Sequence, residues 1–322
     1  MTRRWLALVI GTTFLAAGCT SVGSGPGSGR FPDGDVRLVL PGEAGEHTYT
    51  VARVFAPCLS DRLGTGVTVE NRPGEDGVRG TREFAEADAD PHTLLVAAVG
   101  PTVVAPAVAP DAGYGFEDFG FVGLLHSSPM VLFTGGTGPF DTAEALFGAA
   151  RAAPVEIATT GAWLTEELTV AELNALEGTR FETGRADSDD DVLRGVLAGD
   201  HPAGLAVMSA DLLARTRSGE IRVLAVSGEL APDYLREAPT FARVAGAVSL
   251  PKFTNDTMLI AQGIPADGVI RTLMDAVTDC LNTDTVRQDL GEDFVPDELI
   301  THGELRSLFH RLENAARTAE RR

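Results

Sequence analysis

Two kinds of hydrophobic pattern alternate along the chain. Short runs of consecutive apolar residues are typical of buried strands, and apolar residues at every third or fourth position are typical of helices that pack by one face. The first part of the chain predicts strands at 36–40, 67–70 and 92–99, helices at 50–63 and 79–87, and a long apolar stretch at 121–133 that is interrupted near Ser127-Ser128-Pro129. This alternation of strand and helix is the pattern of an α/β fold.

The same alternation starts again near residue 141. It predicts helices at 141–152, 165–177, 189–198 and 209–217, and strands at 155–159, 180–183, 204–208 and 221–226. A last strand at 258–261 precedes helices at about 266–282, 284–291 and 302–320. Repeated strand–helix connections of this kind predict mainly parallel sheets.

The two series of elements predict two lobes. We expect residues 31–133 and 228–322 to build a discontinuous first lobe, with residues 134–227 inserted as a second lobe. The length of 322 residues agrees with this division, because domains usually contain about 100–200 residues. A fold of two lobes leaves a cleft between them, which is a usual place for a small ligand.

The N-terminus has the pattern of an export signal. Arg3 and Arg4 precede an apolar run at 5–17 that is too short for the ~20 residues of a membrane-spanning helix. The run ends in Ala-Ala-Gly before Cys19, which resembles the lipobox of bacterial lipoproteins. That resemblance implies a signal peptide at 1–18 and a lipid such as palmitate on Cys19. The alternative is an ordinary cleaved signal in which Cys19 is incidental.

Residues 19–30 are rich in glycine and serine, which is typical of a flexible tether. An anchored globular domain needs such a tether. We therefore expect an exported protein that is held at the outer face of the cell membrane by its N-terminal lipid.

The charge balance excludes several kinds of partner. The chain carries 46 acidic against 26 basic residues, for a formal net charge of −20. A surplus of negative charge repels nucleic-acid phosphates and anionic lipid headgroups. We therefore predict no binding to nucleic acid and expect a small molecule as the partner.

Two cysteines, Cys58 and Cys280, remain in the exported part of the chain. An even number of cysteines outside the cytoplasm suggests a disulfide between the first helix and a late one. The alternative is a pair of buried thiols, and the sequence leaves both readings open.

Motifs typical of enzymes are missing from the sequence. It contains no His-Glu-x-x-His motif, no Gly-x-Ser-x-Gly before a helix and no cysteine pairs spaced for zinc. The glycine-rich segment 74–81 lacks the lysine of a phosphate-binding loop. Asp187, Asp189 and Asp191 have the spacing that opens a calcium loop, but the rest of that loop is absent, so we interpret them as helix-capping residues. We predict no enzymatic activity, no metal and no cofactor.

Several motifs in a fixed order carry a resemblance to a known family. They are Val-Arg-Leu-Val-Leu-Pro at 36–41, Val-Glu-Asn-Arg-Pro-Gly at 69–74, Asp-Pro-His-Thr-Leu-Leu at 90–95 and Gly-Glu-Ile-Arg-Val-Leu-Ala-Val at 219–226. In this order they resemble the substrate-binding proteins of tripartite tricarboxylate transporters, the Bug-type extracytoplasmic solute receptors. The resemblance extends over essentially the whole mature chain.

The resemblance implies a fold, a function and a partner. The fold is the two-lobed periplasmic-binding-protein-like fold of type II, with the ligand in the cleft between α/β lobes. The function is capture of a small organic acid, or a related metabolite that bears a carboxylate, for delivery to integral-membrane permease subunits. We expect a monomer. Two alternatives are a sensory protein that presents its ligand to a membrane kinase, and a degenerate surface protein that binds no ligand.

The candidate ligand-binding residues follow the predicted strands. Glycine-rich loops at helix starts hold a carboxylate by backbone N–H groups, and of the histidines only His47 lies at such a strand-to-helix loop. The candidates are Ala44, Gly45, His47, Thr48, Tyr49, Gly74, Gly77, Gly100, Thr102, Thr160, Gly161, Trp163 and Arg185.

Four acidic residues lie on two of these loops, and three of them, Glu46, Glu75 and Asp76, depart from the family's pattern. Glu43, Glu46, Glu75 and Asp76 are expected to lie on loops that face the cleft. If their side chains line the cleft, the solute is neutral, cationic or zwitterionic. If instead they point to solvent, the backbone amides still face an anionic ligand.

Overall fold

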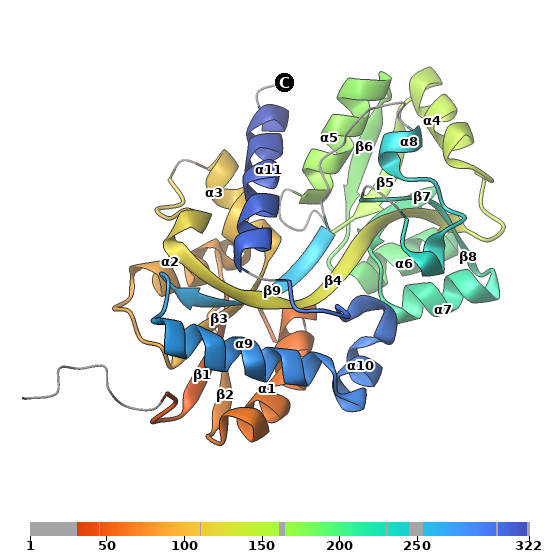
Figure 1. Ribbon diagram of the computed structural model, residues 1–322. Coiled ribbons are helices and arrows are strands. Elements are labelled where there is room, and N and C mark those ends of the chain that lie inside the picture. Colours follow the sequence, from red (N-terminus) through yellow and green to blue (C-terminus); the bar gives the residue numbers. More distant parts are fainter. Residues whose placement is uncertain are drawn as a thin grey trace, which may run out of the picture. The chain divides into compact units, whose positions relative to one another are not determined.

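The strands of this chain share one mixed sheet. The computed structural model describes residues 31–44, 46–109, 111–160, 165–228, 231–244, 254–300 and 302–320. Within them the strand order is β2-β1-β3-β9-β4-β7-β5-β6, and β8 pairs with β4 beside this path. Figure 1 shows this sheet with helices on both of its faces. The α/β class expected from the sequence is confirmed.

The first part of the sheet has three parallel strands. The strands are β1 (Val36–Leu40), β2 (Val67–Asn71) and β3 (Thr93–Ala98), and β1 lies in the middle. We call β2-β1-β3 the first triplet. Helix α1 (His47–Leu63) connects β1 to β2, and α2 (Val78–Glu86) connects β2 to β3.

The second part of the sheet repeats this order. Strands β5 (Val155–Thr159), β6 (Phe181–Arg185) and β7 (Ala203–Val207) are parallel, and β5 lies in the middle. We call β6-β5-β7 the second triplet. Helix α5 (Thr165–Glu177) connects β5 to β6, and α6 (Asp189–Ala198) connects β6 to β7.

Two antiparallel strands join the triplets. β4 (Phe119–Gly135) pairs with β9 (Thr254–Gln262) up to Pro129 and with β7 and β8 (Ile221–Val226) from Met130 onward. The expected interruption near residues 127–129 is therefore wrong, because one strand continues through it. Proline is tolerated there because the strand changes partners at that point and one donor is not needed.

The sheet is mixed rather than mainly parallel. β4 and β9 are antiparallel to each of their neighbours, whereas each triplet is parallel. The direction of a strand depends on tertiary pairing, which local hydrophobic patterns do not report. Strand pairing places β1, β2, β3 and β9 in one group and β5, β6, β7 and β8 in another. Residues 31–322 nevertheless cluster as one unit. The lobe boundaries near residues 133 and 227 thus stay a prediction.

Most remaining elements agree with the expected positions to within a few residues. The α1 helix begins at residue 47 rather than 50, and a π-helical turn follows β3 where no element was expected. The remaining elements are η1 (Glu75–Gly77), η2 (Gly100–Val104), α3 (Ala105–Val108), η3 (Phe116–Asp118), α4 (Ala143–Ala152), α7 (Ala210–Ser218), η4 (Asp233–Leu235), α8 (Phe241–Val244), α9 (Asp267–Leu281), α10 (Asp284–Leu290), η5 (Glu292–Phe294) and α11 (His302–Glu320).

Alternate residues of the strands enter cores on opposite faces of the sheet. In β1, Leu38 packs with residues of α1 and α9, whereas Val39 packs in the cluster that includes α2 and α11. Helix α11 buries Leu305, Phe309, Leu312 and Ala316 along one stripe. It packs on α3 and β4 and also on α5, so it contacts elements of both series, as Figure 1 shows.

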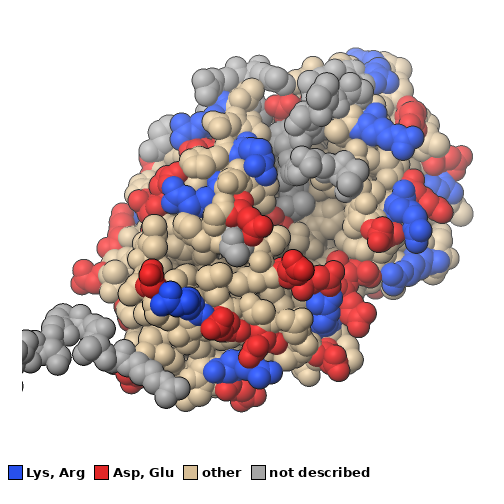
Figure 2. Space-filling model, in the orientation of Figure 1, with Lys and Arg blue, Asp and Glu red and all other residues tan. Residues whose placement is uncertain are grey.

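Acidic and basic side chains share the surface. On the face drawn in Figure 2, basic side chains lie interspersed among acidic ones.

Within the part of the chain that the structure describes, no helix is both long enough and apolar enough to cross a membrane.

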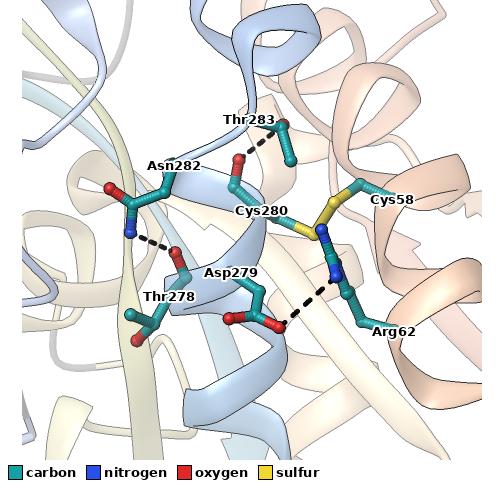
Figure 3. The surroundings of a disulfide bond; sticks show 7 residues. All are labelled: Cys58, Arg62, Thr278, Asp279, Cys280, Asn282 and Thr283. Carbon is teal, nitrogen blue, oxygen red and sulfur yellow. Dashed lines mark hydrogen bonds and ion pairs between the residues drawn. A yellow bond between two sulfur atoms is a disulfide. The ribbon is translucent and has the colours of Figure 1, made fainter.

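A disulfide joins α1 to α9. Cys58 and Cys280 are bonded, with their Cα atoms 5.8 Å apart, and Cys280 is buried (Figure 3). One turn further along α1, Arg62 Nη1 lies 3.6 Å from Asp279 Oδ2. The Thr283 hydroxyl donates to the carbonyl of Cys280 at the end of α9. The cross-link therefore holds together two helices that cover the same face of the first triplet.

Removal of the disulfide is expected to lower stability. Because the bond closes a loop of 222 residues, it restricts the unfolded chain, and loss of such a cross-link typically costs about 2–4 kcal/mol. We expect the double variant Cys58→Ser/Cys280→Ser to lose that much free energy of unfolding, measured by urea denaturation under oxidising conditions. A reductant should lower the free energy of unfolding of the wild type by a similar amount. It should leave the free energy of unfolding of the double variant unchanged. Equal stability of the oxidised wild type and the double variant would contradict the expectation.

Candidate functional site

The carboxyl ends of the parallel strands form two edges at which loops gather. The loops that follow β1, β2 and β3 start at one edge of the first triplet, because the three strands are parallel. The loops that follow β5, β6 and β7 start in the same way at one edge of the second triplet. Open α/β sheets bind ligands outside the carboxyl ends of their strands. These two edges are therefore the candidate site.

The β1–α1 loop contains a carboxylate that bonds to its own backbone. Glu46 is the N-cap residue of α1, but its side chain does not cap the helix. Instead, Glu46 Oε1 accepts a hydrogen bond from the backbone N–H of Glu43 at 2.9 Å. Ala44 is exposed, and Gly45 lies outside the described residues. The first turn of α1, formed by His47, Thr48 and Tyr49, thus begins without a side-chain cap on its N–H groups.

Tyr49 lies in a different environment from that of His47. It lines a groove between α1 and α10, together with Cys58 and Val286. The guanidinium of Arg53 lies 5.9 Å from the centre of the Tyr49 ring. The side chain of Tyr49 therefore belongs to the helical layer beside the disulfide.

The β2–α2 turn has an unusual backbone conformation. Gly74, Glu75, Asp76 and Gly77 all have positive φ angles, of 133°, 49°, 52° and 82°. A Cβ atom at Gly77 would lie 3.0 Å from the carbonyl oxygen of Pro41, so glycine is required where this turn meets the end of β1. For Glu75 and Asp76 the left-handed conformation costs about 1–2 kcal/mol each. Such strain is often found at functional turns.

The carboxylate of Glu75 has a partner on the helix that follows. Glu75 Oε2 lies 3.2 Å from Arg82 Nη2 on α2. Both side chains are partly exposed, so the pair contributes little to stability. The negative charge of Glu75 is thus offset locally.

The turn after β3 is buried. Gly100 begins the π-helical turn, and Thr102 is fully buried within it. The Thr102 hydroxyl donates to the carbonyl of Ala98 at 2.8 Å. This hydroxyl therefore stabilises the turn itself.

The β5–α5 connection contains a buried glutamate. Glu166, in the first turn of α5, is 1% exposed. Its Oε2 accepts hydrogen bonds from the hydroxyls of Thr159 and Thr160, the latter at 3.1 Å. Gly161 and Trp163 lie outside the described residues. At this edge of the second triplet, the hydroxyls of Thr159 and Thr160 therefore already donate to a carboxyl group of the protein.

The β6–α6 connection contains a half-buried carboxylate, that of Asp189. Ser188, not an aspartate, caps α6 by accepting from the backbone N–H of Asp191 at 3.2 Å. Asp189 Oδ1 has no solvent-accessible surface and no hydrogen-bond partner among the described residues. Burial, and after it the charge of Asp190, raises the pKa of Asp189 to about 6. Arg185, at the end of β6, is exposed.

Two histidines meet between α1 and β4. Nε2 of His47 lies 3.0 Å from Nδ1 of His126, and His126 is 2% exposed. Burial lowers the pKa of His47 to about 4 and that of His126 well below its usual value, with the neighbouring His47 adding to the second effect. Both imidazoles are therefore neutral near pH 7, and one donates to the other. The centre of the Phe294 ring lies 5.7 Å from the centre of the His126 ring.

Polar groups also lie near the end of the pairing between β4 and β9. The Ser127 hydroxyl donates to Asp256 Oδ1 at 2.6 Å, and Asp256 is buried. The hydroxyls of Ser128 and Thr257 are buried and have no partner among the described residues. Because Ser127 bonds to Asp256 while His126 bonds to His47, this serine and histidine do not form a nucleophile–base pair. The arrangement can supply hydrogen bonds to a solute but has no activated nucleophile at this point.

The structure brings together some residues that the sequence did not connect. His47 meets His126, and Thr160 meets Glu166. The sequence pattern does not mark His126, Ser127, Asp256 or Glu166 as residues of the site. The one available signal was the presence of histidine and serine inside an apolar strand. No group of three or more His, Cys, Asp or Glu side chains within the described ranges is placed to hold a metal ion.

The histidine pair predicts acid sensitivity. Below pH 6.5 the unfolded chain binds a proton at residue 47 that the folded chain does not bind until about pH 4. The free energy of unfolding therefore falls as pH drops through this window, by up to about 3 kcal/mol for this one group. We expect His47→Gln to flatten the pH dependence, measured by urea denaturation between these two pH values. The control is His201→Gln, which removes an imidazole 2.8 Å from Glu156 on the second triplet. Identical pH profiles for the wild type and His47→Gln would rule out the effect.

Solved structures share this fold. A TctC solute-binding protein from Polaromonas matches with a TM-score of 0.73 and 19% identity, covering 90% of this chain and 98% of that one. MatC of Rhodopseudomonas palustris, solved with bound malate, matches with a TM-score of 0.70 and 23% identity over 90% of this chain and all of that one. Rpa4515 of R. palustris, solved with adipate, matches with a TM-score of 0.73 and 23% identity. The match covers 90% of this chain and 98% of that one. These likenesses confirm the periplasmic-binding-protein fold.

Sequence comparison identifies the family. BugT of Bordetella pertussis is 30% identical over 277 residues, which cover 81% of this chain and 82% of BugT. The model of the tripartite tricarboxylate transporter family receptor, TctC, matches residues 51–297. This match covers most of the chain, and it agrees with the order of motifs in the sequence. The chain therefore belongs to the TctC family of extracytoplasmic solute receptors.

Proposed function

We propose that this chain is a lipid-anchored receptor that captures a small carboxylate-bearing solute and delivers it to the permease of a tripartite tricarboxylate-type transporter. The observation that carries the proposal is the family match over residues 51–297. The structural neighbours MatC and Rpa4515 were solved with malate and adipate, which are both dicarboxylates. A related carboxylic acid is the class of ligand that we propose here.

Backbone amides at helix starts are the proposed anchors for a carboxylate. The uncapped first turn of α1 offers N–H groups from residues 47–49. The turn at Gly74 and Gly77 lies beside the same loop, since Gly77 contacts Pro41. Helix N-termini favour anions through their free N–H groups and their dipole. The first triplet therefore supplies the proposed site for a carboxylate.

Loops of the second triplet would complete the site when the two parts of the sheet close on the solute. Thr160, Gly161, Trp163 and Arg185 follow or end strands of that triplet. Closure by a hinge is the usual mechanism of such receptors. We place the hinge where β4 leaves its pairing with β9 and begins to pair with β7 and β8. His126, whose neutral imidazole bonds to that of His47, lies near this point of β4.

Ligand binding can be tested on the mature protein. We expect at least one small carboxylic acid to raise the melting temperature in a panel of mono-, di- and tricarboxylates, amino acids and carboxylic amides. A solute present at about 100 times its dissociation constant adds about 2.7 kcal/mol to the free energy of unfolding. Native mass spectrometry of the freshly purified protein should show a bound small acid. If neither measurement detects any solute, the chain is not a receptor for this class.

Anchoring can be tested separately. With wild-type Cys19 we expect the exported protein in the membrane fraction, and with Cys19→Ala we expect it in the soluble fraction, because the lipid has no attachment point. Ser21→Ala, in the same tether, serves as the control and should stay with the membrane. Membrane association of Cys19→Ala equal to that of the wild type would show that Cys19 carries no anchor.

A further inference from the structure

We infer that residues 291–294 form a strap that joins the two parts of the sheet on one face, and that Phe294 is the residue that resists their separation. The strap consists of Gly291 and the 3-10 turn η5, directly after α10. This role goes beyond the proposed function, because it concerns the relative motion of the two parts and does not depend on the solute.

The two faces of the sheet differ in how their hydrophobic cores continue from one part to the other. On the face that α11 covers, one cluster extends from α2 to β6. The other face has two clusters among the described residues, one with α1, α9 and Leu38, the other with α6, α7 and Phe133. Both lie opposite the first cluster, because the strand neighbours Val39 and Leu132 belong to it. The core of this second face is therefore divided where the two parts of the sheet meet.

Polar residues of β4 lie at this division. Leu125 is the last residue of β4 in the cluster on α1 and α9, and Val131 is the first in the cluster on α6 and α7. We call residues 126–129, which lie between them, the seam. The imidazole of His126 is buried in the seam, 3.0 Å from that of His47 on α1. Because a polar pair replaces apolar contacts here, separation of the two parts at the seam exposes less apolar surface than separation elsewhere.

The strap places apolar side chains on both sides of the seam. Leu290 and Val295, which flank the strap, are buried in the cluster on α1 and α9. Phe294 is 3% exposed and belongs to the cluster on α6 and α7. The centre of its ring lies 5.7 Å from that of His126 and 5.5 Å from that of Tyr234 in η4. Separation at the seam would withdraw this ring from one cluster or its neighbours from the other, and either movement exposes apolar surface to water.

Two further contacts hold the strap in position. Gly291 has a φ of 87°, and a Cβ atom there would lie 2.8 Å from Cδ2 of Phe294, so glycine is needed to place the ring. Asp293 Oδ2 lies 3.3 Å from Arg217 Nη2 on α7. Both of these charged side chains are exposed, so their ion pair adds little. The resistance to separation therefore comes mainly from the phenyl ring of Phe294.

The distance between two spin labels tests the strap in the full mature chain. Ala214→Cys on α7 and Asp275→Cys on α9 provide exposed labelling sites on the two parts, with the native disulfide intact. The distance distribution is measured by double electron–electron resonance without added solute. In Phe294→Ala we expect the ratio of longer to shorter distances to rise at least about tenfold. A distribution identical to that of the labelled chain with Phe294 overturns the inference and leaves the proposed receptor function standing.

A second phenylalanine separates this effect from a general loss of stability. Phe147→Ala removes a buried phenyl ring that packs against Phe181 within the second part of the sheet, so it should leave the distances unchanged. Melting curves establish that each variant is folded. Equal lengthening in Phe294→Ala and Phe147→Ala overturns the role of the strap.

A matched pair of glycines keeps the test decisive if Phe294→Ala does not fold. Gly291→Ala brings a methyl group against the ring of Phe294 and should lengthen the distances in the same direction. Gly199 also has a positive φ, of 82°, but a Cβ atom there would meet no other atom within 4 Å. We therefore expect Gly199→Ala to leave the distances unchanged, and equal distributions in the two glycine variants overturn the assignment of the strap.

Discussion

The architecture depends on one long strand that belongs to both parts of the sheet. The first residues of β4 pair with β9, and its last residues pair with β7 and β8. Nearly all of its side chains are buried, because helices cover it on both faces. The two triplets are thus tied to one continuous backbone segment. Any relative motion of the triplets must bend β4 or its pairing with β9, and Ser127 and Asp256 lie near the end of that pairing, where β4 changes partners.

The sequence predicted local elements well and tertiary relations poorly. The ranges of β5, β8, α6 and α11 match the hydrophobic pattern because each element buries a stripe with the period of its own secondary structure. The antiparallel direction of β4 and β9 was missed, because direction depends on partners distant in the chain. The continuity of β4 through Pro129 was missed for the same reason, since a change of partner leaves no mark on the apolar pattern.

The candidate site was predicted at the level of loops but not of side chains. Strand-to-helix connections can be inferred from periodicity, so the loops after β1, β2 and β5 were expected. The pairing of His47 with His126 joins residues far apart in the chain, and no local spacing indicates it. The same holds for Ser127 and Asp256. Of the four acidic residues expected around the cleft, Glu46 bonds to its own loop and Glu75 to Arg82. The buried carboxyl group is that of Glu166 instead, which looks in the sequence like an ordinary residue of a helix's first turn.

The bond between Cys58 and Cys280 has a topological consequence. The whole chain between α1 and α9, including the second triplet, lies within the covalent ring that this bond closes. A single cut by a protease in any loop of that ring would open the backbone without releasing a fragment. The nicked protein would keep its size until a reductant was added. In an extracytoplasmic compartment, where proteases act and thiols stay oxidised, this ring keeps both halves of the receptor attached to each other.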